Sequence, residues 1–258
     1  MKAKKSYGQH FLNNEDISHK IADSLCLISS YQNVLEVGPG KGMLTKYLQK
    51  KEFNLVVVEA DKDMVQYLKK HYPNLKERII EADFLKVPLD KIFGDSPFGL
   101  IGNFPYNISS QILFRMLEYK NLIPEMVGMF QKEVAERVVS KEGSKSYGVI
   151  SVLIQAHYHG ELLFEVDKGN FNPPPKVQSA VIRLTRRDDF QLSCDPKLFN
   201  RVVKQAFSQR RKMLRNTMKS FTKNPDFLRK SFLTKRPEQL SLNGFVQLTQ
   251  WIEQEITP

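Results

Sequence analysis

The feature that most constrains the fold is an alternation of continuous apolar runs with helix-like segments along the first 140 residues. Five runs rich in Val, Ile and Leu predict strands, at 33–37, 54–59, 77–83, 98–103 and 125–130. Between them, apolar residues spaced three and four apart predict helices, at 43–51, 61–72, 108–119 and 131–140. Strands that are apolar on both faces are typical of a parallel sheet covered by helices on both sides. The sequence therefore predicts an α/β fold.

The pattern differs before and after this region. A helix is expected from Asn14 to about Ile28, ahead of the first strand. After residue 140, the segment 149–166 predicts a helix leading into a strand, and the alternating segment VQSAVIRL predicts another strand. We expect these two strands to close the sheet as an antiparallel pair. Residues 1–187 are then a catalytic domain, and residues 188–258 a small all-helical domain.

The positive charge of the chain is concentrated near its C-terminus. The 258 residues carry a net charge of +11. Residues 181–258 hold 16 Lys or Arg against 7 Asp or Glu, so +9 of that charge lies there. A basic block of this kind favours a polyanionic partner over a merely solvated helix face, and nucleic acid is the commonest large polyanion.

The remaining bulk properties place the chain among ordinary globular proteins. Its residues are 41% hydrophobic and 26% charged. No apolar run approaches the ~18 residues of a membrane span, and the basic start lacks the apolar stretch of a secretion signal. Cys26 and Cys194 lie far apart, which indicates reduced thiols. We therefore expect a cytoplasmic protein with no membrane association.

A glycine-rich loop follows the first expected strand. The segment LEVGPGKG places Gly38, Gly40 and Gly42 where glycine allows a sharp turn and lets a ligand approach main-chain N–H groups. Glu59 ends the second strand, where a carboxylate can bind a ribose diol, and Asp83 ends the third, within reach of an adenine edge. The pattern indicates an adenosine-type cofactor. The third glycine comes one position earlier than in the dinucleotide fingerprint, which favours S-adenosylmethionine.

The loop Asn-Phe-Pro-Tyr, residues 103–106, follows the fourth strand at the same edge of the sheet. An adenine amine is a poor nucleophile because its lone pair is delocalised into the ring. The side-chain oxygen of Asn103 and a main-chain carbonyl fixed by Pro105 can accept both amine hydrogens and aim the lone pair at a sulfonium methyl. Positioning and electrostatics then supply most of the catalysis, and no strong base is required.

The aromatic residues near this loop suit a base that has left its stack. Such a base needs new stacking faces, each worth ~1–3 kcal/mol. We expect Tyr106 to cover one face and Phe171, from the proline-stiffened segment FNPPPK, to cover the other. Phe104 alternates away from Tyr106 and is expected in the core.

Taken together, these segments resemble the S-adenosylmethionine-dependent rRNA adenine dimethyltransferases, and most closely the bacterial enzymes of the small ribosomal subunit. The resembling segments cover most of the chain in the same order: YGQHFL, EVGPGKG, NFPYNIS, QKEVAER, SYG, FNPPPKVQSAVIRL and AFSQRRKMLRN. The resemblance implies a Rossmann-like class I methyltransferase fold, with a mostly parallel seven-stranded sheet and a small helical C-terminal domain. It also implies dimethylation of the exocyclic amines of two adjacent adenosines in the 3'-terminal hairpin loop of small-subunit rRNA, within a ribosomal assembly intermediate.

By position, the resemblance assigns roles to particular residues. Cofactor contacts fall on His10, Leu12, Gly38, Gly40, Glu59, Asp83 and Asn103. The catalytic residues are Asn103, Pro105 and Tyr106, with Phe171 as the second stacking ring. The family usually has Leu or Ile where Phe104 stands, and often Asn where His10 stands. We expect no metal, because the sequence offers no further ligands beside His157 and His159. We also expect a monomer.

A basic cluster lies in the segment AFSQRRKMLRN. Its members, Arg210, Arg211, Lys212 and Arg215, fall within two turns if the segment is helical, and such a cluster can track phosphates. An alternative is a helix that contacts the main domain, with the arginines paired to its acids, since arginine serves both uses.

Three other functions are compatible with parts of this sequence. The nearest is a large-subunit rRNA adenine methyltransferase of the antibiotic-resistance type, disfavoured by the segments PPPKVQSAVIRL and AFSQRRKMLRN. The second is a non-catalytic rRNA-binding assembly factor, disfavoured by the intact loop 103–106 beside Glu59 and Asp83. The third is a nicotinamide-dependent oxidoreductase, which leaves the basic tail unexplained and lacks a proton-transfer residue near the loop.

Overall fold

The computed structural model describes residues 10–256, and these fall into two compact units. The first unit comprises residues up to 135 together with 160–186 and holds the sheet. The second comprises 136–159 together with the residues from 187 onward and is mainly helical. Residues 136–159 therefore pack with the C-terminal helices, although they precede the last strands in sequence.

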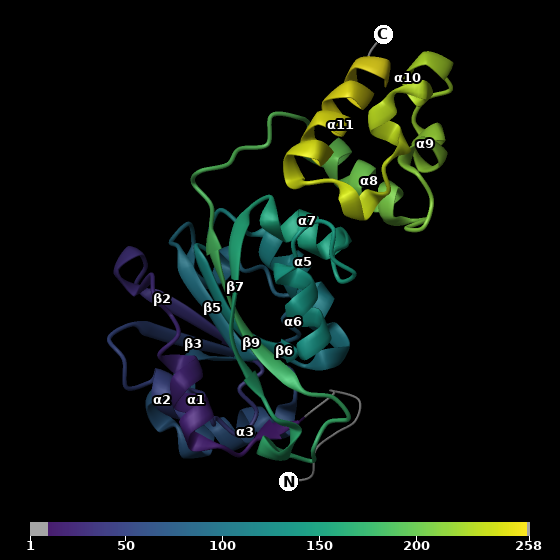
Figure 1. Cartoon of the computed structure of the whole chain (residues 1–258). Coiled ribbons are helices and arrows are strands. Elements are labelled where there is room, and N and C mark those ends of the chain that lie inside the picture. The colour runs from purple at the N-terminus through teal and green to yellow at the C-terminus, as the bar shows by residue number, and fades with distance from the viewer. Residues whose placement is uncertain (1–9, 257–258) are drawn as a thin grey trace. The chain divides into compact units, whose positions relative to one another are not determined.

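The main sheet has seven strands in the order β4-β3-β2-β5-β6-β9-β7 (Figure 1). The strands are β2 (Asn33–Val37), β3 (Asn54–Glu59), β4 (Ile79–Glu81), β5 (Phe98–Asn103), β6 (Glu125–Gln131), β7 (Tyr158–Val166) and β9 (Ser179–Arg186). Pairs among β2 to β6 are parallel, whereas β9 runs antiparallel to β6. The mostly parallel seven-stranded sheet expected from the sequence is confirmed. The chain runs outward from β2 to β4 and returns to β5, so the strand order reverses beside β2, where ligands bind in such sheets.

Helices cover both faces of this sheet. Those before and between its strands are α1 (Glu15–Ala22), α2 (Thr45–Leu48), α3 (Lys62–His71), α4 (Asp90–Phe93), α5 (Ser109–Glu118) and α6 (Lys132–Val139). Figure 1 shows α1, α2 and α3 on one side of the sheet and α5 on the other. Asn14 and Asp61 cap α1 and α3, because their side chains accept hydrogen bonds from the main-chain N–H groups of Ile17 and Asp63.

The first helix is shorter than the sequence predicts, since it ends at Ala22 rather than near Ile28. The cause lies in β6. The carboxylate of Glu125 accepts hydrogen bonds from the main-chain N–H groups of Cys26 (2.8 Å) and Leu27 (2.9 Å), and from the Tyr31 hydroxyl (2.6 Å). Main-chain donors held in this way are not used to extend the helix. A buried carboxylate almost a hundred residues away thus sets where α1 ends.

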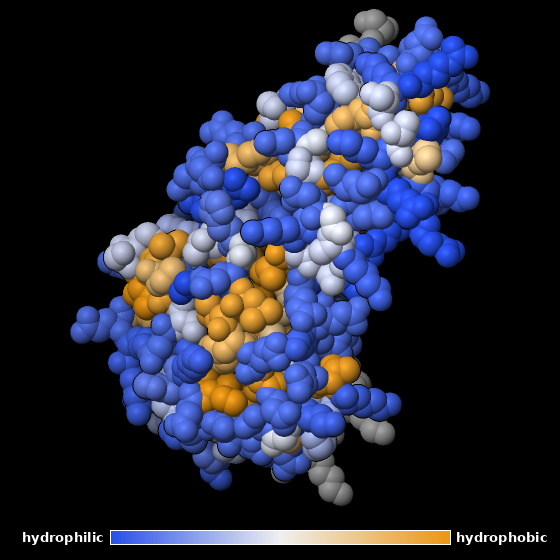
Figure 2. All heavy atoms as spheres, in the orientation of Figure 1, coloured by the Kyte–Doolittle hydropathy of each residue, from blue (hydrophilic) through white to orange (hydrophobic). Residues whose placement is uncertain are grey.

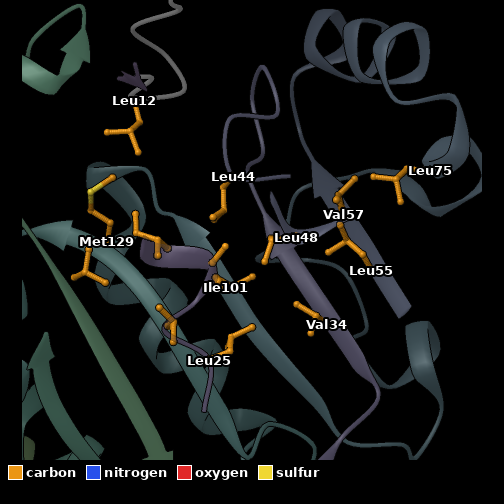
Figure 3. Packing of buried hydrophobic residues seen from close by; sticks show 14 of the residues in the cluster. Leu12, Leu25, Val34, Leu44, Leu48, Leu55, Val57, Leu75, Ile101 and Met129 are labelled. Carbon is orange, nitrogen blue, oxygen red and sulfur yellow. The ribbon is translucent and has the colours of Figure 1, made fainter. Parts of the chain in front are cut away.

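A cluster of buried side chains joins α1, α2 and α3 to one face of the sheet. Figure 3 shows Val34, Leu55, Val57 and Ile101 on the strands beside Leu44 and Leu48 from the segment after β2. Burying an aliphatic side chain of this size stabilises the fold by about 1.5–3 kcal/mol. Leu12 and Phe171 belong to the same cluster, so the core extends to the edge where the strands end.

A two-stranded sheet that the sequence did not predict ties the start of the chain to the FNPPPK segment. β1 (Phe11–Leu12) pairs antiparallel with β8 (Phe171–Asn172), and Leu12 lies opposite Phe171. The main-chain N–H of Asn13 also donates to the carbonyl of Asn170 at 2.9 Å. Two-residue strands carry no periodicity from which they could be recognised in the sequence.

The second unit contains the helices α7 (Val149–Gln155), α8 (Pro196–Phe207), α9 (Leu214–Thr217), α10 (Pro225–Arg229) and α11 (Leu242–Ile256). Asp195 caps α8, accepting from the main-chain N–H of Leu198 at 2.6 Å, and Pro196 occupies the first turn. Phe207 stacks on Phe245 with ring centroids 5.7 Å apart. Hydrophilic residues cover most of the face of this unit seen in Figure 2.

Short 3₁₀ turns complete both units, at Ile28–Ser30, Pro73–Arg78, Tyr106–Ile108, Lys168–Asn170, Met218–Ser220, Ser231–Thr234 and Pro237–Gln239. Within residues 10–256, no helix is both long enough and apolar enough to cross a membrane.

Candidate active site

A cavity of about 520 Å³ lies in the first unit, where β2, β3, β4 and β5 end. This is the edge at which the strand order reverses, and its volume suits a small-molecule ligand. Nine residues predicted from the sequence line it: His10, Leu12, Gly38, Gly40, Glu59, Asp83, Asn103, Pro105 and Tyr106. The structure thus brings together residues that are more than ninety positions apart in the sequence.

The glycine loop forms one wall of the cavity. Gly38, Gly40 and Gly42 have φ angles of 66°, 56° and 79°, in the left-handed region that glycine enters without strain. A Cβ atom at position 42 would lie 2.5 Å from the ring of Tyr72, whose hydroxyl donates to the Gly42 carbonyl at 2.8 Å. The close approach of Tyr72 explains why the third glycine stands where it does.

Glu59 is placed at the end of β3 and is 6% exposed. Its two carboxylate oxygens accept hydrogen bonds from the main-chain N–H groups of Gly40 (3.0 Å) and Asp61 (2.9 Å). Burial raises the pKa of this carboxyl, and the two main-chain donors act against the rise. Each oxygen keeps a second lone pair that can accept from a ligand hydroxyl.

Asp83 lies in the loop after β4, two residues beyond the end of the strand at Glu81. One of its oxygens accepts from the main-chain N–H of Leu85 at 3.0 Å. The loop between strand and helix therefore presents Asp83 to the cavity, in place of the strand end that the sequence predicted.

Asn103 is the last residue of β5 and is held by the start of the chain. Its amide Nδ2 donates to the main-chain carbonyl of His10 at 3.2 Å. This bond fixes which end of the amide is the donor, so Oδ1 is the acceptor end at the cavity. The next main-chain N–H, of Phe104, donates to the carbonyl of Met129 on β6 at 3.2 Å.

Tyr106 is held from two sides. Its hydroxyl is hydrogen-bonded to the hydroxyl of Ser179, a buried residue at the start of β9. Its ring stacks with that of His10, with centroids 5.5 Å apart and planes at 27°. Burial raises the pKa of the Tyr106 hydroxyl, so the phenol stays protonated and keeps its hydrogen bond. Sequence reasoning missed Ser179, which is a polar residue at a buried position of an alternating strand.

Phe104 is a core residue, as expected. It is 1% exposed and packs against Phe130, with ring centroids 5.0 Å apart. A Cβ atom at Gly128 would lie 2.2 Å from its ring. The neighbouring strand therefore makes room for a large side chain at this position by carrying a glycine.

Phe171 does not stand where the sequence predicted. It is 3% exposed, lies within the core cluster and is not among the residues lining the cavity. Its place in β8 explains this, because successive side chains of a strand point to opposite sides. Phe171 points into the core opposite Leu12, and Asn172 is exposed. The ring that stands beside Tyr106 is that of His10.

Three of the four residues of the basic cluster lie between two helices, and the fourth, Arg215, lies on α9. α8 ends at Phe207 and α9 begins at Leu214, so Arg210, Arg211 and Lys212 lie in the connecting turn. Arg210 donates to the carbonyl of Ser144 at 3.2 Å, within the same unit. Arg211 and Lys212 are exposed, and Arg215, on α9, contacts the sulfur of Met213 at 3.2 Å. Arg210 thus has a structural contact, while its two neighbours face solvent.

Glu36 also lines the cavity, and sequence reasoning missed it. It is 1% exposed within β2, and its carboxylate accepts from the Thr45 hydroxyl at 2.7 Å. Burial, helped by the neighbouring carboxylate of Glu59, raises the pKa of Glu36 to about 8. A charged residue inside the apolar run NVLEV was the signal available in the sequence.

Within the described residues, no group of three or more His, Cys, Asp and Glu side chains is arranged to hold a metal ion. The polar side chains that line the cavity are four carboxylates, two carboxamides, a lysine, a histidine and a tyrosine: Glu36, Glu59, Glu81, Asp83, Asn103, Asn107, Lys41, His10 and Tyr106. Such groups suit the hydroxyls, amines and carboxylate of a nucleoside-type ligand.

Comparison of the whole sequence with known proteins gives consistent matches over almost its full length. The model of the family "Ribosomal RNA adenine dimethylase" matches residues 1–248. A protein of Flavobacterium johnsoniae named ribosomal RNA small subunit methyltransferase A is 53% identical over 253 residues, covering 98% of this chain and 97% of its own. One of the same name from Bacteroides fragilis is 52% identical over 257 residues, covering 99% and 94%.

Solved structures show the same fold. A dimethyladenosine transferase from Plasmodium falciparum superimposes with a TM-score of 0.79 at 25% identity, covering 95% of this chain and 98% of its own. The 23S rRNA methyltransferase ErmE superimposes with a TM-score of 0.68 at 23% identity, covering 93% and 99%. The matched length, the high identities and the class I methyltransferase fold together show that this chain belongs to the ribosomal RNA adenine dimethylase family.

Proposed function

We propose that this protein dimethylates the exocyclic amines of two adjacent adenosines in the 3'-terminal hairpin loop of small-subunit rRNA, with S-adenosylmethionine as methyl donor. Its relatives at about half identity over almost the whole chain carry the name of the small-subunit enzyme. The observation that carries the proposal is the convergence of Asn103, Tyr106 and Glu59 on one cavity at the switch point of the sheet.

The residues at the cavity suit S-adenosylmethionine. Glu59 accepts from the ribose diol through its remaining lone pairs, and Asp83 accepts from the adenine amine. The main chain at Gly38 and Gly40 allows a close approach, and His10 and Leu12 cover the cavity from the start of the chain. When bound, the donor supplies an electrophilic methyl group on a sulfonium.

The loop after β5 holds the target amine. Asn103 Oδ1 accepts one amine hydrogen, because the donor end of the amide is tied to His10. The Pro105 carbonyl already accepts from the main-chain N–H of Ile108 and the hydroxyl of Ser109. The second acceptor is therefore the carbonyl of Phe104, whose orientation the following proline fixes. The two bonds direct the nitrogen lone pair toward the methyl group, and water takes the proton that the alkylated amine releases.

The ring of Tyr106 provides the stacking face for the extruded adenine. Its hydrogen bond to Ser179 fixes the angle of the ring, so less conformational freedom is lost when the base binds. The stack contributes ~1–3 kcal/mol. Phe171 has no part in this arrangement, since its ring lies in the core.

The C-terminal unit contributes rRNA contacts. Arg211 and Lys212 stand exposed in the turn between α8 and α9, and with Arg210 and Arg215 they form the basic cluster. We assign residues 1–187 to cofactor binding and catalysis, and residues 188–258 to phosphate contacts. The substrate that fits these roles is a small-subunit assembly intermediate in the cytoplasm, bound by a monomer.

A methyl-transfer assay tests the proposal. The protein is incubated with labelled S-adenosylmethionine and either undermethylated small subunits or large subunits, and the modified nucleotides are mapped. We expect four methyl groups per small subunit, on two neighbouring adenines. Label in large-subunit rRNA instead would indicate the antibiotic-resistance activity. Binding of small subunits with no label incorporated would indicate an assembly factor without catalysis, and would overturn the proposal.

A further inference from the structure

The cofactor cavity contains two buried carboxylates with unequal surroundings. Glu36 on β2 and Glu59 on β3 are 1% and 6% exposed, and both line the cavity. Glu59 accepts from two main-chain N–H groups, at 3.0 and 2.9 Å. Glu36 accepts from the Thr45 hydroxyl at 2.7 Å, and the main-chain N–H of Thr45 adds a weaker favourable interaction. The two sites therefore differ in how well they stabilise a negative charge.

Ionising both carboxyl groups in one buried space costs much free energy, because neither solvent nor protein screens the two charges well. The negative charge settles on the better-solvated group, which is Glu59, and the proton remains on Glu36. The raised pKa of Glu36, about 8, agrees with this division and has burial as its main cause.

The other ionisable groups around Glu36 add little positive charge. Tyr72 follows the end of α3, and burial, helped by the negative charge of Glu36, raises the pKa of its hydroxyl to about 12. Glu81 and Asp83 line the cavity from the end of β4, and the cationic or potentially cationic lining residues are Lys41 and His10. Acidic groups therefore outnumber basic ones around the space that the cofactor fills.

We propose that Glu36 is a proton-linked positioning residue, which lets the cavity distinguish the cationic methyl donor from its neutral thioether product. The inference rests on the cofactor assignment above. With the donor in the cavity, the carboxylic acid of Glu36 would release its proton to solvent, and its carboxylate would share the cavity with the positive charge of the sulfonium. After the methyl group has moved to the amine, the sulfur is neutral, and Glu36 takes a proton back from solvent. The donor is held by charge, and the product loses that interaction.

Donor and product differ in charge by one unit at the sulfur, while both carry the ammonium and carboxylate of the amino-acid end. A nearby positive charge lowers the pKa of a carboxyl group by about 1–3 units, because it stabilises the carboxylate. A group that is largely protonated at pH 7 when the cavity is empty then becomes largely ionised when the donor fills it. The product carries the same ammonium and carboxylate but no sulfonium, so it does not lower the pKa by this amount.

Titration calorimetry on the full-length protein tests this without RNA. Binding of S-adenosylmethionine or S-adenosylhomocysteine is measured at pH 7 in buffers of different ionisation enthalpy, which gives the number of protons released. We expect the donor to release roughly half a proton or more beyond the product. In Glu36→Gln the difference should vanish, and the preference for the donor should fall by roughly tenfold or more. Glutamine keeps the oxygen that Thr45 binds, so the variant isolates the charge.

Glu125→Gln is the matched control, because Glu125 is equally buried but does not line the cavity. Its proton counts should equal those of the unaltered protein. The unaltered protein also gives an independent measurement, if its glutamate carboxyl carbons are labelled with ¹³C. One protonated glutamate resonance at pH 7 should shift to the carboxylate position with the donor, and stay in place with the product.

Equal proton release by donor and product, or an unchanged difference in Glu36→Gln, would overturn the proposal. So would a ¹³C spectrum that is the same with either ligand. Absence of binding by either ligand would overturn it together with the cofactor assignment. Because the measurement needs no RNA, failure of rRNA methylation with normal proton release would count against the proposed function alone.

Discussion

At the scale of single residues, the site depends on side chains whose orientation is fixed by neighbours far away in sequence. Asn103 is oriented by the carbonyl of His10, and Tyr106 by the hydroxyl of Ser179. An amide that donates at one end presents its oxygen at the other, which is the end needed to accept from an amine. The residue-scale predictions concern Asn103 and the buried carboxyl of Glu36.

Asn103→Ala should lower the rate of methyl transfer by about 10²–10³-fold, as loss of one preorganised polar contact to the reacting group does. Affinity for small subunits should change less than about threefold, since the basic cluster is untouched. Single-turnover kinetics and a binding titration measure the two quantities separately. Asn121→Ala, at an exposed asparagine outside the cavity, is the control. Parallel loss of binding and rate would contradict the catalytic role of Asn103.

Glu36→Gln should change the pH dependence of stability in the absence of ligands. The folded-state pKa of Glu36, about 8, is raised above that of the unfolded chain, near 4.5. Between these values the folded protein holds a proton that the unfolded chain releases, so the free energy of unfolding falls as pH rises. The variant has no such carboxyl, so its free energy of unfolding does not fall in this way. Between pH 5 and pH 8, that free energy should rise by on the order of 2–4 kcal/mol relative to the unaltered protein. Urea unfolding at several pH values measures it, and a constant difference would contradict the buried-acid assignment.

At the scale of elements, two neighbouring strands share the space around Phe104. The ring lies against Gly102 on its own strand β5 and Gly128 on β6, and it packs on Phe130. The glycine on β6 and the large residue on β5 are therefore a matched pair. The resemblance to the family indicated only that Phe104 is bulkier than usual, and the structure shows what accommodates it.

Gly128→Ala should destabilise the protein by about 1–3 kcal/mol, because the added methyl would lie 2.2 Å from the Phe104 ring. Phe104→Leu leaves a cavity and should cost a similar amount. The double variant should be more stable than the sum of the two single changes predicts, by about 1 kcal/mol or more. A thermal-unfolding double-mutant cycle measures the coupling. Additive effects would show that the two positions do not compete for space.

At the scale of the whole molecule, charge and chemistry lie in different parts of the chain. The cavity belongs to the first unit, and the exposed pair Arg211 and Lys212 belongs to the second. The fold confirms the α/β architecture and the closing antiparallel strand, which followed from apolar runs and their spacing. The turn between α8 and α9 was not foreseen, because its basic residues continue the helical pattern that precedes them.

Replacing Arg211 and Lys212 together by alanine should weaken RNA binding and make the slope of log K against log salt shallower by about 1–2. The rate of methyl transfer at saturating RNA should equal that of the unaltered protein. Replacing Lys69 and Lys70, two exposed residues on α3, removes the same charge from the first unit and serves as control. Binding measured from low to moderate salt tests the prediction, and equal slopes for both variants would remove the turn from the RNA-binding surface.

The sequence by itself determined the parallel sheet, the glycine loop and nine of the residues around the cavity. These follow from local information, since continuous apolar runs, positive φ angles and strand ends each leave a mark within a few residues. Only the tertiary structure decided that Phe171 lies in the core, that Glu125 ends α1, and that Glu36 shares a cavity with Glu59. The physical reason is that burial and hydrogen-bond partners are set by residues distant in sequence. Whether a ring is buried, and whether a carboxyl is protonated, is therefore decided only when the folded chain brings those residues together.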